Sequence, residues 1–589
     1  AWMPASSRRV ETTTIRSFDG TLLRARVVDG LPRNTTSKKR SVSPALAVIY
    51  ITSWATPSVE YVVPMLEDSD RVRGAVAYAA RGFYASGGTV SFAGPDDLRD
   101  ASAAIDWALN RWRQEETSTR QEETDVLRVA LCGVSYGAGI ALLAAARDAR
   151  VSRVVAFSPW ASLYRDLNWH ESPSRVWARL LLVTGQMTGR LDPTIWRMWR
   201  NVETHRNLTA VRAWLRGREP SEERTVRNLT HVPILMLSDL DDGLMLSQHA
   251  LQFWRRLPCR KKKLVFGYGT HAQAEIKGLF GFDGRDGPWR MAREWLAFAL
   301  DDAPGTEHSV TFLRVEGSSA GGTTSVTRLE FDAWPPSRDD WVRVDFFLVV
   351  QQNFCTLTTS FFTGEPPRAT KDDDDDDTGN FEEIVVSLKY GRAPPVLTSG
   401  AIPIVSDILK ARTAAPLTDL ALARVVFVSD PLPRATVVLG VPSLSDLAVV
   451  PRQSSFQLYA YLYAVEPPPS TLATLITHVP YTAWNVTQGA RHLLPPLQFT
   501  AAAFHLPARH RLALGFNMKN ALYTPAIGEN DAAVDLVLPS ARGRDDASAA
   551  AAETAALQRG HEDPSATAGA ARAFPRLMVP LLLSTQTQQ

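Results

Sequence analysis

Apolar and polar residues alternate along the chain in two different ways. Up to about residue 300, short apolar runs such as 45–51, 74–80 and 151–157 are separated by segments with helical periodicity, such as 96–112. Apolar runs of this length are typical of strands that are buried on both faces. Their alternation with helices predicts a largely parallel sheet, so we expect an α/β fold in this part of the chain.

Other segments of the first 300 residues complete this prediction. Residues 10–28 alternate as a hairpin with Asp19 and Gly20 at its turn. The segment 163–231 is rich in Trp, Arg and Leu and lacks strand-like alternation, which favours a helical insertion. Strand-like runs resume at 232–237 and 263–266, and the periodicity of 288–300 predicts a closing helix.

The pattern changes after residue 304. Strand-like runs, among them 309–315, 342–350 and 456–465, are separated by clusters of Pro, Gly and Ser. This pattern predicts an all-β domain of sandwich or jelly-roll type. We therefore expect two domains, 1–304 and 305–589, and within the second domain low-complexity loops at 372–377 and 540–573.

Length and composition narrow the class of protein. A chain of 589 residues is expected to form two or three domains. Lys and Arg total 64 and Asp and Glu total 62, so the net charge of +2 does not favour a nucleic-acid partner. No apolar run approaches the roughly 18–20 residues of a membrane-spanning helix. The three cysteines match no zinc spacing, and we expect neither a metal nor a cofactor.

The chain begins with Ala1 and carries four N-x-[ST] glycosylation signals. These features favour a processed glycoprotein of the secretory pathway, although the low cysteine count neither requires nor excludes an oxidising compartment. The candidate acceptors are Asn34, Asn207, Asn228 and Asn485.

The strongest chemical signal is a G-x-S-x-G motif at 133–137, which ends an apolar strand and begins a helix rich in small residues. This context is typical of a nucleophile elbow, with Ser135 as nucleophile and the backbone N–H of Tyr136 as an oxyanion donor. A second match at 317–321 is followed by a strand-like run, so we interpret it as a loop. A second oxyanion donor is expected at 52–54, where Trp54 is our candidate.

A serine nucleophile needs a base and an orienting acid, which in this fold follow in the order Ser, Asp/Glu, His. Among Asp239, Asp241 and Asp242, which follow a predicted strand, we favour Asp242 as the acid, with Asp241 as runner-up. The alternative is that these aspartates cap a helix beginning near Leu244. His271 follows the next predicted strand and is the candidate base.

These residues resemble the X-Pro dipeptidyl-peptidase and cocaine-esterase-like serine hydrolases. The similar motifs are residues 81–88, 93–97, 133–136 and 269–272. The resemblance implies an α/β-hydrolase domain with a helical cap at about 163–231, followed by a jelly-roll (galactose-binding-like) domain. It also implies that Ser135, Asp242 and His271 act as nucleophile, acid and base.

We therefore expect a metal-independent serine hydrolase that cleaves an ester or amide bond, with X-Pro peptides as one substrate class. The alternative hypothesis is a hydrolase-like glycoprotein that serves assembly or binds carbohydrate, because the chain combines glycosylation signals with a large β domain. Small ester, amide or peptide substrates are the expected partners. The sequence does not decide whether the chain also forms a homo-oligomer or binds an assembly partner.

Overall fold

The computed structural model divides the chain into two compact units. The first unit consists of Ala1–Asn168, Pro173–Arg314 and Thr327–Pro336, and the second of Trp169–Ser172, Val315–Val326 and Ser337–Gln589. The structure describes residues 10–29, 46–57, 72–114, 127–267, 269–272, 275, 287–297, 307–312, 316–317, 329–336, 341–351, 354–359, 383–389, 414–416, 425–470, 472–518, 520, 522–523, 533–541 and 575–583.

A ten-stranded sheet forms the centre of the first unit, in the order β1-β2-β4-β3-β5-β6-β9-β10-β11-β13. Neighbours from β4 to β11 are parallel, whereas β1, β2 and β13 pair antiparallel at the two edges. The strands are β1 (Glu11–Arg16), β2 (Leu22–Asp29), β3 (Leu46–Ile51), β4 (Val72–Tyr78), β5 (Arg128–Val134), β6 (Val151–Phe157), β9 (Ile234–Asp239), β10 (Lys261–Gly267), β11 (Glu307–Phe312) and β13 (Leu329–Phe331).

The predicted parallel α/β sheet is thus observed, and strand β6 has the predicted limits. The boundary expected at residue 304 differs from the one observed. Strand β11 pairs in parallel with β10, and β13 then pairs antiparallel with β11. The run that we assigned to the β domain therefore extends the first sheet, because an apolar strand can pair with either neighbour and its sequence does not specify which.

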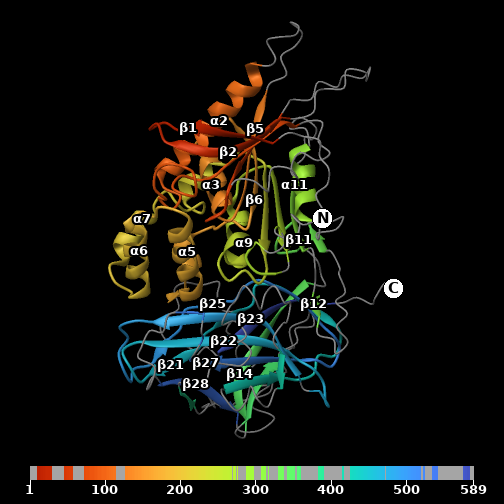
Figure 1. The fold of residues 1–589 in the computed structure, drawn as a ribbon. Helices are drawn as coiled ribbons and strands as arrows, with labels where there is room; N and C mark the ends of the chain where they lie inside the picture. Colours follow the sequence, from red (N-terminus) through yellow and green to blue (C-terminus); the bar gives the residue numbers. More distant parts are fainter. Residues whose placement is uncertain are drawn as a thin grey trace, which may run out of the picture. The chain divides into compact units, whose positions relative to one another are not determined.

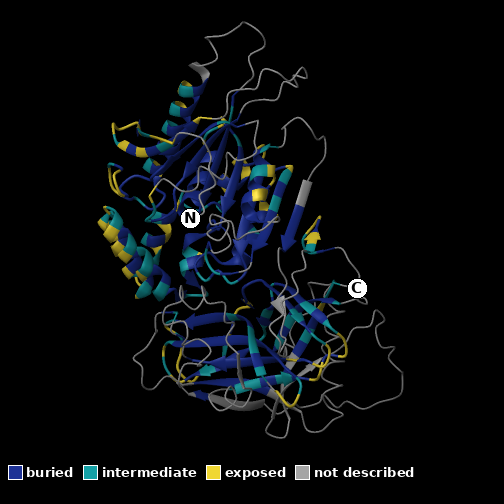
Figure 2. Cartoon of the chain, turned by 45° about the vertical axis from the view of Figure 1, so that its right-hand side comes forward, coloured by how far each residue is buried: buried dark blue, intermediate teal, exposed yellow. Residues whose placement is uncertain are grey.

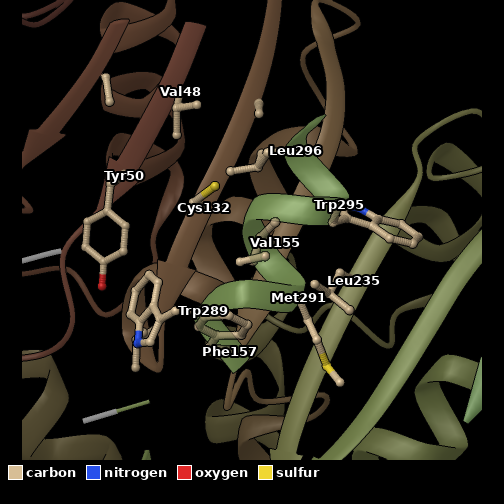
Figure 3. Close-up of a cluster of buried hydrophobic side chains, with 14 of the residues drawn as sticks. Val48, Tyr50, Cys132, Val155, Phe157, Leu235, Trp289, Met291, Trp295 and Leu296 are labelled. Atoms are coloured by element: carbon tan, nitrogen blue, oxygen red, sulfur yellow. The ribbon is translucent and has the colours of Figure 1, made fainter. Parts of the chain in front are cut away.

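Helices cover the sheet on both faces (Figure 1). They are α2 (Pro95–Gln114), α3 (Tyr136–Ala145), α9 (Ser247–Arg256) and α11 (Pro288–Ala297). Every residue of α3 is buried, as expected for a helix of small and aliphatic residues packed on strands. Figure 3 shows Trp289, Met291 and Trp295 of α11 among side chains of the central strands, where the Trp289 ring lies edge-on to Phe157 at 5.1 Å.

The segment between β6 and β9 is the predicted helical insertion. Its helices are α4 (Leu163–Leu167), α5 (Arg175–Thr188), α6 (Pro193–Glu203), α7 (Leu208–Leu215) and α8 (Glu223–Asn228). A pair of two-residue strands, β7 (Asn168–Trp169) and β8 (Ser172–Pro173), was not predicted. Figure 2 shows the strands of the sheet buried, whereas the helices of the insertion expose one face.

The second unit is β-rich. In the part of it that the structure describes, seventeen strands are linked by pairing, and the ten residues of β22 are all buried between β23 and β27. The strands are β12 (Glu316–Gly317), β14 (Trp341–Gln351), β15 (Phe354–Thr359), β16 (Glu383–Lys389), β17 (Ala414–Pro416), β18 (Val425–Ser429), β19 (Thr436–Gly440), β20 (Ser443–Ser445), β21 (Ala448–Pro451), β22 (Phe456–Val465), β23 (Leu472–Ala483), β24 (His492–Leu493), β25 (Leu497–Gln498), β26 (Ala502–Leu506), β27 (Arg511–Asn517), β28 (Ala533–Ala541) and β29 (Arg576–Leu583).

Several predictions fall on residues outside those described. They concern Asn34, most of the second G-x-S-x-G match, the aspartate run at 372–377 and nearly all of 540–573. Among the described helices, none is both long and apolar enough to cross a membrane.

Candidate active site

Ser135 lies on the turn between β5 and α3. Its backbone has φ 54° and ψ −114°, a conformation that is strained for a residue with a side chain. The turn is held in place because the Ser135 N–H donates to the Phe157 carbonyl at 2.8 Å. This is the geometry predicted for a nucleophile elbow.

The two glycines of the motif are required by close approach of the backbone. A Cβ atom on Gly133 would lie 2.3 Å from the carbonyl carbon of Gly137. A Cβ atom on Gly137 would lie 1.9 Å from the carbonyl oxygen of Ile51. Strand, turn and helix can therefore pack in this way only without side chains at these positions.

The loops after β9 and β10 lie side by side. The Leu240 N–H donates to the Gly267 carbonyl at 3.1 Å, and the Asp241 N–H donates to the Gly269 carbonyl at 3.2 Å. The pairing of these loops brings Asp242 and His271 together, although they are 29 residues apart in sequence.

Ser135, His271 and Asp242 form a continuous hydrogen-bonded chain. His271 Nε2 lies 2.7 Å from Ser135 Oγ, and His271 Nδ1 lies 2.7 Å from Asp242 Oδ2. A carboxylate can only accept, so Nδ1 carries the proton and Nε2 is the acceptor for the serine hydroxyl. The structure thus brings together the three residues that the sequence singled out.

Asp242 has two structural roles. Its side chain is fully buried, and while Oδ2 faces His271, Oδ1 accepts the N–H groups of Leu244 and Met245, both at 2.8 Å. Asp242 therefore also caps the turn that follows it, the role that the sequence offered as the alternative for these aspartates. Helix α9 itself begins later than expected, at Ser247.

The surroundings of His271 favour its charged form. Burial disfavours the imidazolium, but the Asp242 carboxylate, through its charge and its hydrogen bond, outweighs burial and raises the pKa of His271 above its ordinary value. Glu275 and Asp166 add to this effect. Such a field stabilises the imidazolium that forms when a histidine accepts a proton from serine.

The predicted oxyanion donors, Tyr136 and Trp54, belong to helix α3 and to the loop after β3. Tyr136 is the first residue of α3, so its N–H has no acceptor within the helix. Ser53 Oγ donates to the Val134 carbonyl at 2.9 Å and thereby holds the loop that carries Trp54 against the elbow. This arrangement is compatible with a donor from Trp54, whose role stays a prediction.

Residues 81–88, which suggested the family, are structural. Arg81 is buried and binds Asp100 with two hydrogen bonds, Nε to Oδ2 at 2.7 Å and Nη2 to Oδ1 at 2.6 Å. Ser86 Oγ donates to the Ala79 carbonyl and accepts the Arg24 N–H. The motif therefore attaches the loop that follows β4 both to strand β2 and to helix α2.

Sequence reasoning missed Glu275, which lies four residues after His271. Its side chain is fully buried, and Oε1 accepts a hydrogen bond from Ser158 Oγ at 2.8 Å. Burial raises the pKa of Glu275 to about 7. No periodicity or motif in the sequence signals this carboxyl group.

A second buried Asp–His pair connects the insertion to the loop after β9 and to helix α9. Asp166 Oδ1 lies 2.6 Å from His249 Nδ1 and also accepts the Leu246 N–H at 3.2 Å. Trp177 of α5 lies edge-on to the His271 ring, with centroids 6.0 Å apart. The insertion thus contacts both the loop after β9 and His271.

The remaining site predictions concern glycosylation and metal binding. Asn207, Asn228 and Asn485 are exposed, and Asn228 Nδ2 donates to the Ala146 carbonyl at 2.9 Å. Within the described ranges, no group of three or more His, Cys, Asp or Glu side chains is arranged to hold a metal ion.

Comparison with known proteins places this geometry in context. The X-Pro dipeptidyl-peptidase (S15 family) matches residues 19–273, while no curated protein matches the chain. Similar solved structures include a CocE/NonD family hydrolase from Staphylococcus aureus (TM-score 0.62, 12% identity, covering 97% of this chain and 93% of that one). An aminopeptidase from a marine sediment Thaumarchaeota archaeon (TM-score 0.59, 14% identity) and an α-amino acid ester hydrolase (TM-score 0.58, 15% identity) each cover 99% of this chain and 98% of their own. These likenesses show the fold, an α/β-hydrolase-like unit followed by a β-rich one.

Proposed function

We propose that the chain is a serine hydrolase that cleaves ester or amide bonds through an acyl-enzyme on Ser135, which its similarity to the X-Pro dipeptidyl-peptidase (S15) family over residues 19–273 supports. The observation that carries this proposal is the unbroken chain of two 2.7 Å contacts from Asp242 through His271 to Ser135. Such an arrangement lets a neutral imidazole activate a hydroxyl that is a weak nucleophile by itself.

Acylation follows from the positions of the hydrogen-bonded atoms. Ser135 Oγ attacks the substrate carbonyl carbon while its proton moves to His271 Nε2, and the Asp242 carboxylate stabilises the resulting imidazolium. The negative charge that develops on the carbonyl oxygen is stabilised by the Tyr136 N–H, with the loop at Trp54 as the proposed second donor. When the tetrahedral intermediate collapses, the bond to the leaving group breaks and His271 donates the proton to that group.

Deacylation repeats these steps with water as nucleophile. His271 accepts a proton from water, the hydroxyl adds to the acyl carbon, and Ser135 leaves as a neutral hydroxyl after it regains a proton from His271. X-Pro peptides are one candidate substrate class, which the family name supports. Simple acyl esters are the other candidate class.

The test is turnover of acyl p-nitrophenyl esters and X-Pro p-nitroanilides by the full chain and by Ser135→Ala. The proposal expects kcat to fall by at least about 10⁴-fold in the variant. Ser152→Ala is the matched control, because Ser152 lies on β6 and donates to the Val129 carbonyl at 2.8 Å within the same sheet. Equal rates for wild type and Ser135→Ala would overturn the proposal and favour a non-catalytic scaffold.

Two finer predictions accompany this proposal. We propose a jelly-roll arrangement for the β-rich unit, supported by the antiparallel pairing of β22 with β23 and β27. We also propose secretion with N-glycosylation, supported by the exposure of Asn207 and Asn485. A mass shift after peptide N-glycosidase treatment of the protein from its native source would test glycosylation, and an unchanged mass would contradict it.

A further inference from the structure

The helical insertion contains an apolar pocket. About 560 Å³ of space free of protein atoms, part of it open to solvent, lies among α4, α5, α6 and α7 and the loop after β3. Its lining is aliphatic and aromatic, with Trp54, Trp199 and Trp214 among the larger side chains. No charged side chain is among the described residues that line it.

One wall of the pocket adjoins the nucleophile. Trp54 lines the pocket, and its ring lies edge-on to that of Tyr136 with centroids 5.2 Å apart. Tyr136 directly follows Ser135. Trp54 Nε1 donates to the Leu181 carbonyl of α5 at 2.8 Å, so the indole is held between the elbow and the insertion.

The wall formed by α5 adjoins His271. Helix α5 places Trp177 against His271, and the next residue, Ala178, lines the pocket. The same tryptophan lies close to the loop after β9, which carries Asp242, since a Cβ atom on Gly243 would be 3.0 Å from Trp177 Nε1. Helix α5 therefore borders the triad and the pocket at once.

We infer that this pocket receives the acyl side of the substrate and selects uncharged, apolar acyl groups. The inference rests on the proposed function and names its substrate class. Each methylene that moves from water into such a pocket contributes about 0.8 kcal/mol, about a fourfold gain in kcat/KM. A carboxylate or ammonium group there would lose its water without gaining a counter-charge from the lining residues. The lining thus favours aliphatic and aryl esters or amides over peptides that place a free amino terminus there.

The first test uses a series of p-nitrophenyl esters from acetate to decanoate. We expect kcat/KM to rise about fourfold per methylene until the pocket is full. The p-nitrophenyl monoester of adipic acid has the chain length of the hexanoate but ends in a carboxylate, and we expect its kcat/KM to be lower by at least about 30-fold. A preference for acetate, or equal rates for hexanoate and adipate, would overturn the inference.

Variants then locate the preference in the pocket. Ala178→Leu on α5 and Val211→Phe on α7 add atoms to buried lining positions. We expect each variant to lower the ratio of kcat/KM for hexanoate to that for acetate by at least tenfold. Val183→Phe is the matched control, because Val183 lies on the same helix as Ala178 and is exposed. Unchanged ratios in both pocket variants, with folding confirmed by thermal unfolding, would contradict the inference.

Binding without chemistry separates this inference from the proposed function. Octanamide binding to Ser135→Ala, measured by equilibrium dialysis, should be retained, and adding Ala178→Leu should weaken it at least tenfold. If octanamide binds in this way but no ester is hydrolysed by the wild type, the pocket stands and the proposed function fails. If esters are hydrolysed but octanamide does not bind, the pocket inference fails alone.

Discussion

Asp242→Asn tests the orientation of the base. Asp242 Oδ1 accepts two backbone N–H groups, whereas Oδ2 faces His271. In the variant, the amide oxygen is expected to keep the two backbone bonds, because an NH₂ group there would leave both donors unpaired. The NH₂ group would then face Nδ1, which must become an acceptor. The proton would move to Nε2, and the imidazole could no longer accept the proton of Ser135.

The expected loss in kcat is about 10⁴-fold, which corresponds to about 5 kcal/mol of transition-state stabilisation. The assay is hydrolysis of a p-nitrophenyl ester, with the melting temperature measured alongside, because the retained backbone bonds predict a folded variant. Asp241→Asn is the matched control and should keep near-wild-type kcat. Near-wild-type activity of Asp242→Asn, or an equal loss in Asp241→Asn, would refute the reasoning.

Three further predictions address protonation and packing. Because only neutral His271 can accept the serine proton and its pKa is raised above 6.5, kcat/KM should fall as pH is lowered through a value above 6.5; a midpoint below 6.5 would contradict this. Gly137→Ala should destabilise the fold by about 3 kcal/mol or more in denaturant unfolding, because the new Cβ atom meets the Ile51 carbonyl, and a change below about 1 kcal/mol would disagree. Folded Glu275 has a pKa of about 7 against an ordinary 4.5, so it keeps a proton that the unfolded chain releases as pH rises through this window. The melting temperature of the wild type should therefore decline between pH 4.5 and 7, and Glu275→Gln should lessen this decline. An equally steep decline in Glu275→Gln would contradict this prediction.

Local sequence signals were enough to single out Ser135, His271 and a short run of aspartates, and the structure brings Ser135 and His271 within hydrogen-bonding distance of each other. The elbow was predictable because it needs glycines where backbones nearly touch, as at Gly133 and Gly137. His271 and Asp242 were predictable because both follow strands of one parallel sheet, whose carboxyl ends lie on one edge. The choice between Asp241 and Asp242 depended on loop geometry that no pattern encodes.

Features that depend on tertiary packing were not predictable in this way. Strand β11 belongs to the first sheet, although its residue pattern is similar to that of the strands in the β-rich unit that follows. Glu275 and the Asp166–His249 pair are single polar residues whose burial results from distant elements. The contact of Trp177 with His271 likewise depends on how the insertion folds over the sheet. Periodicity reports which face of an element is buried but not what covers it.

Labelling with a fluorophosphonate, followed by peptide mapping, tests the central claim most directly. The reagent reacts with a serine only where a base activates it and an oxyanion hole stabilises the adduct. Our account predicts one adduct per chain, on the peptide that contains Ser135, and none in Ser135→Ala or Asp242→Asn over the same time. No adduct on the folded wild-type protein, or an adduct at Ser319 of the second G-x-S-x-G match, would contradict it.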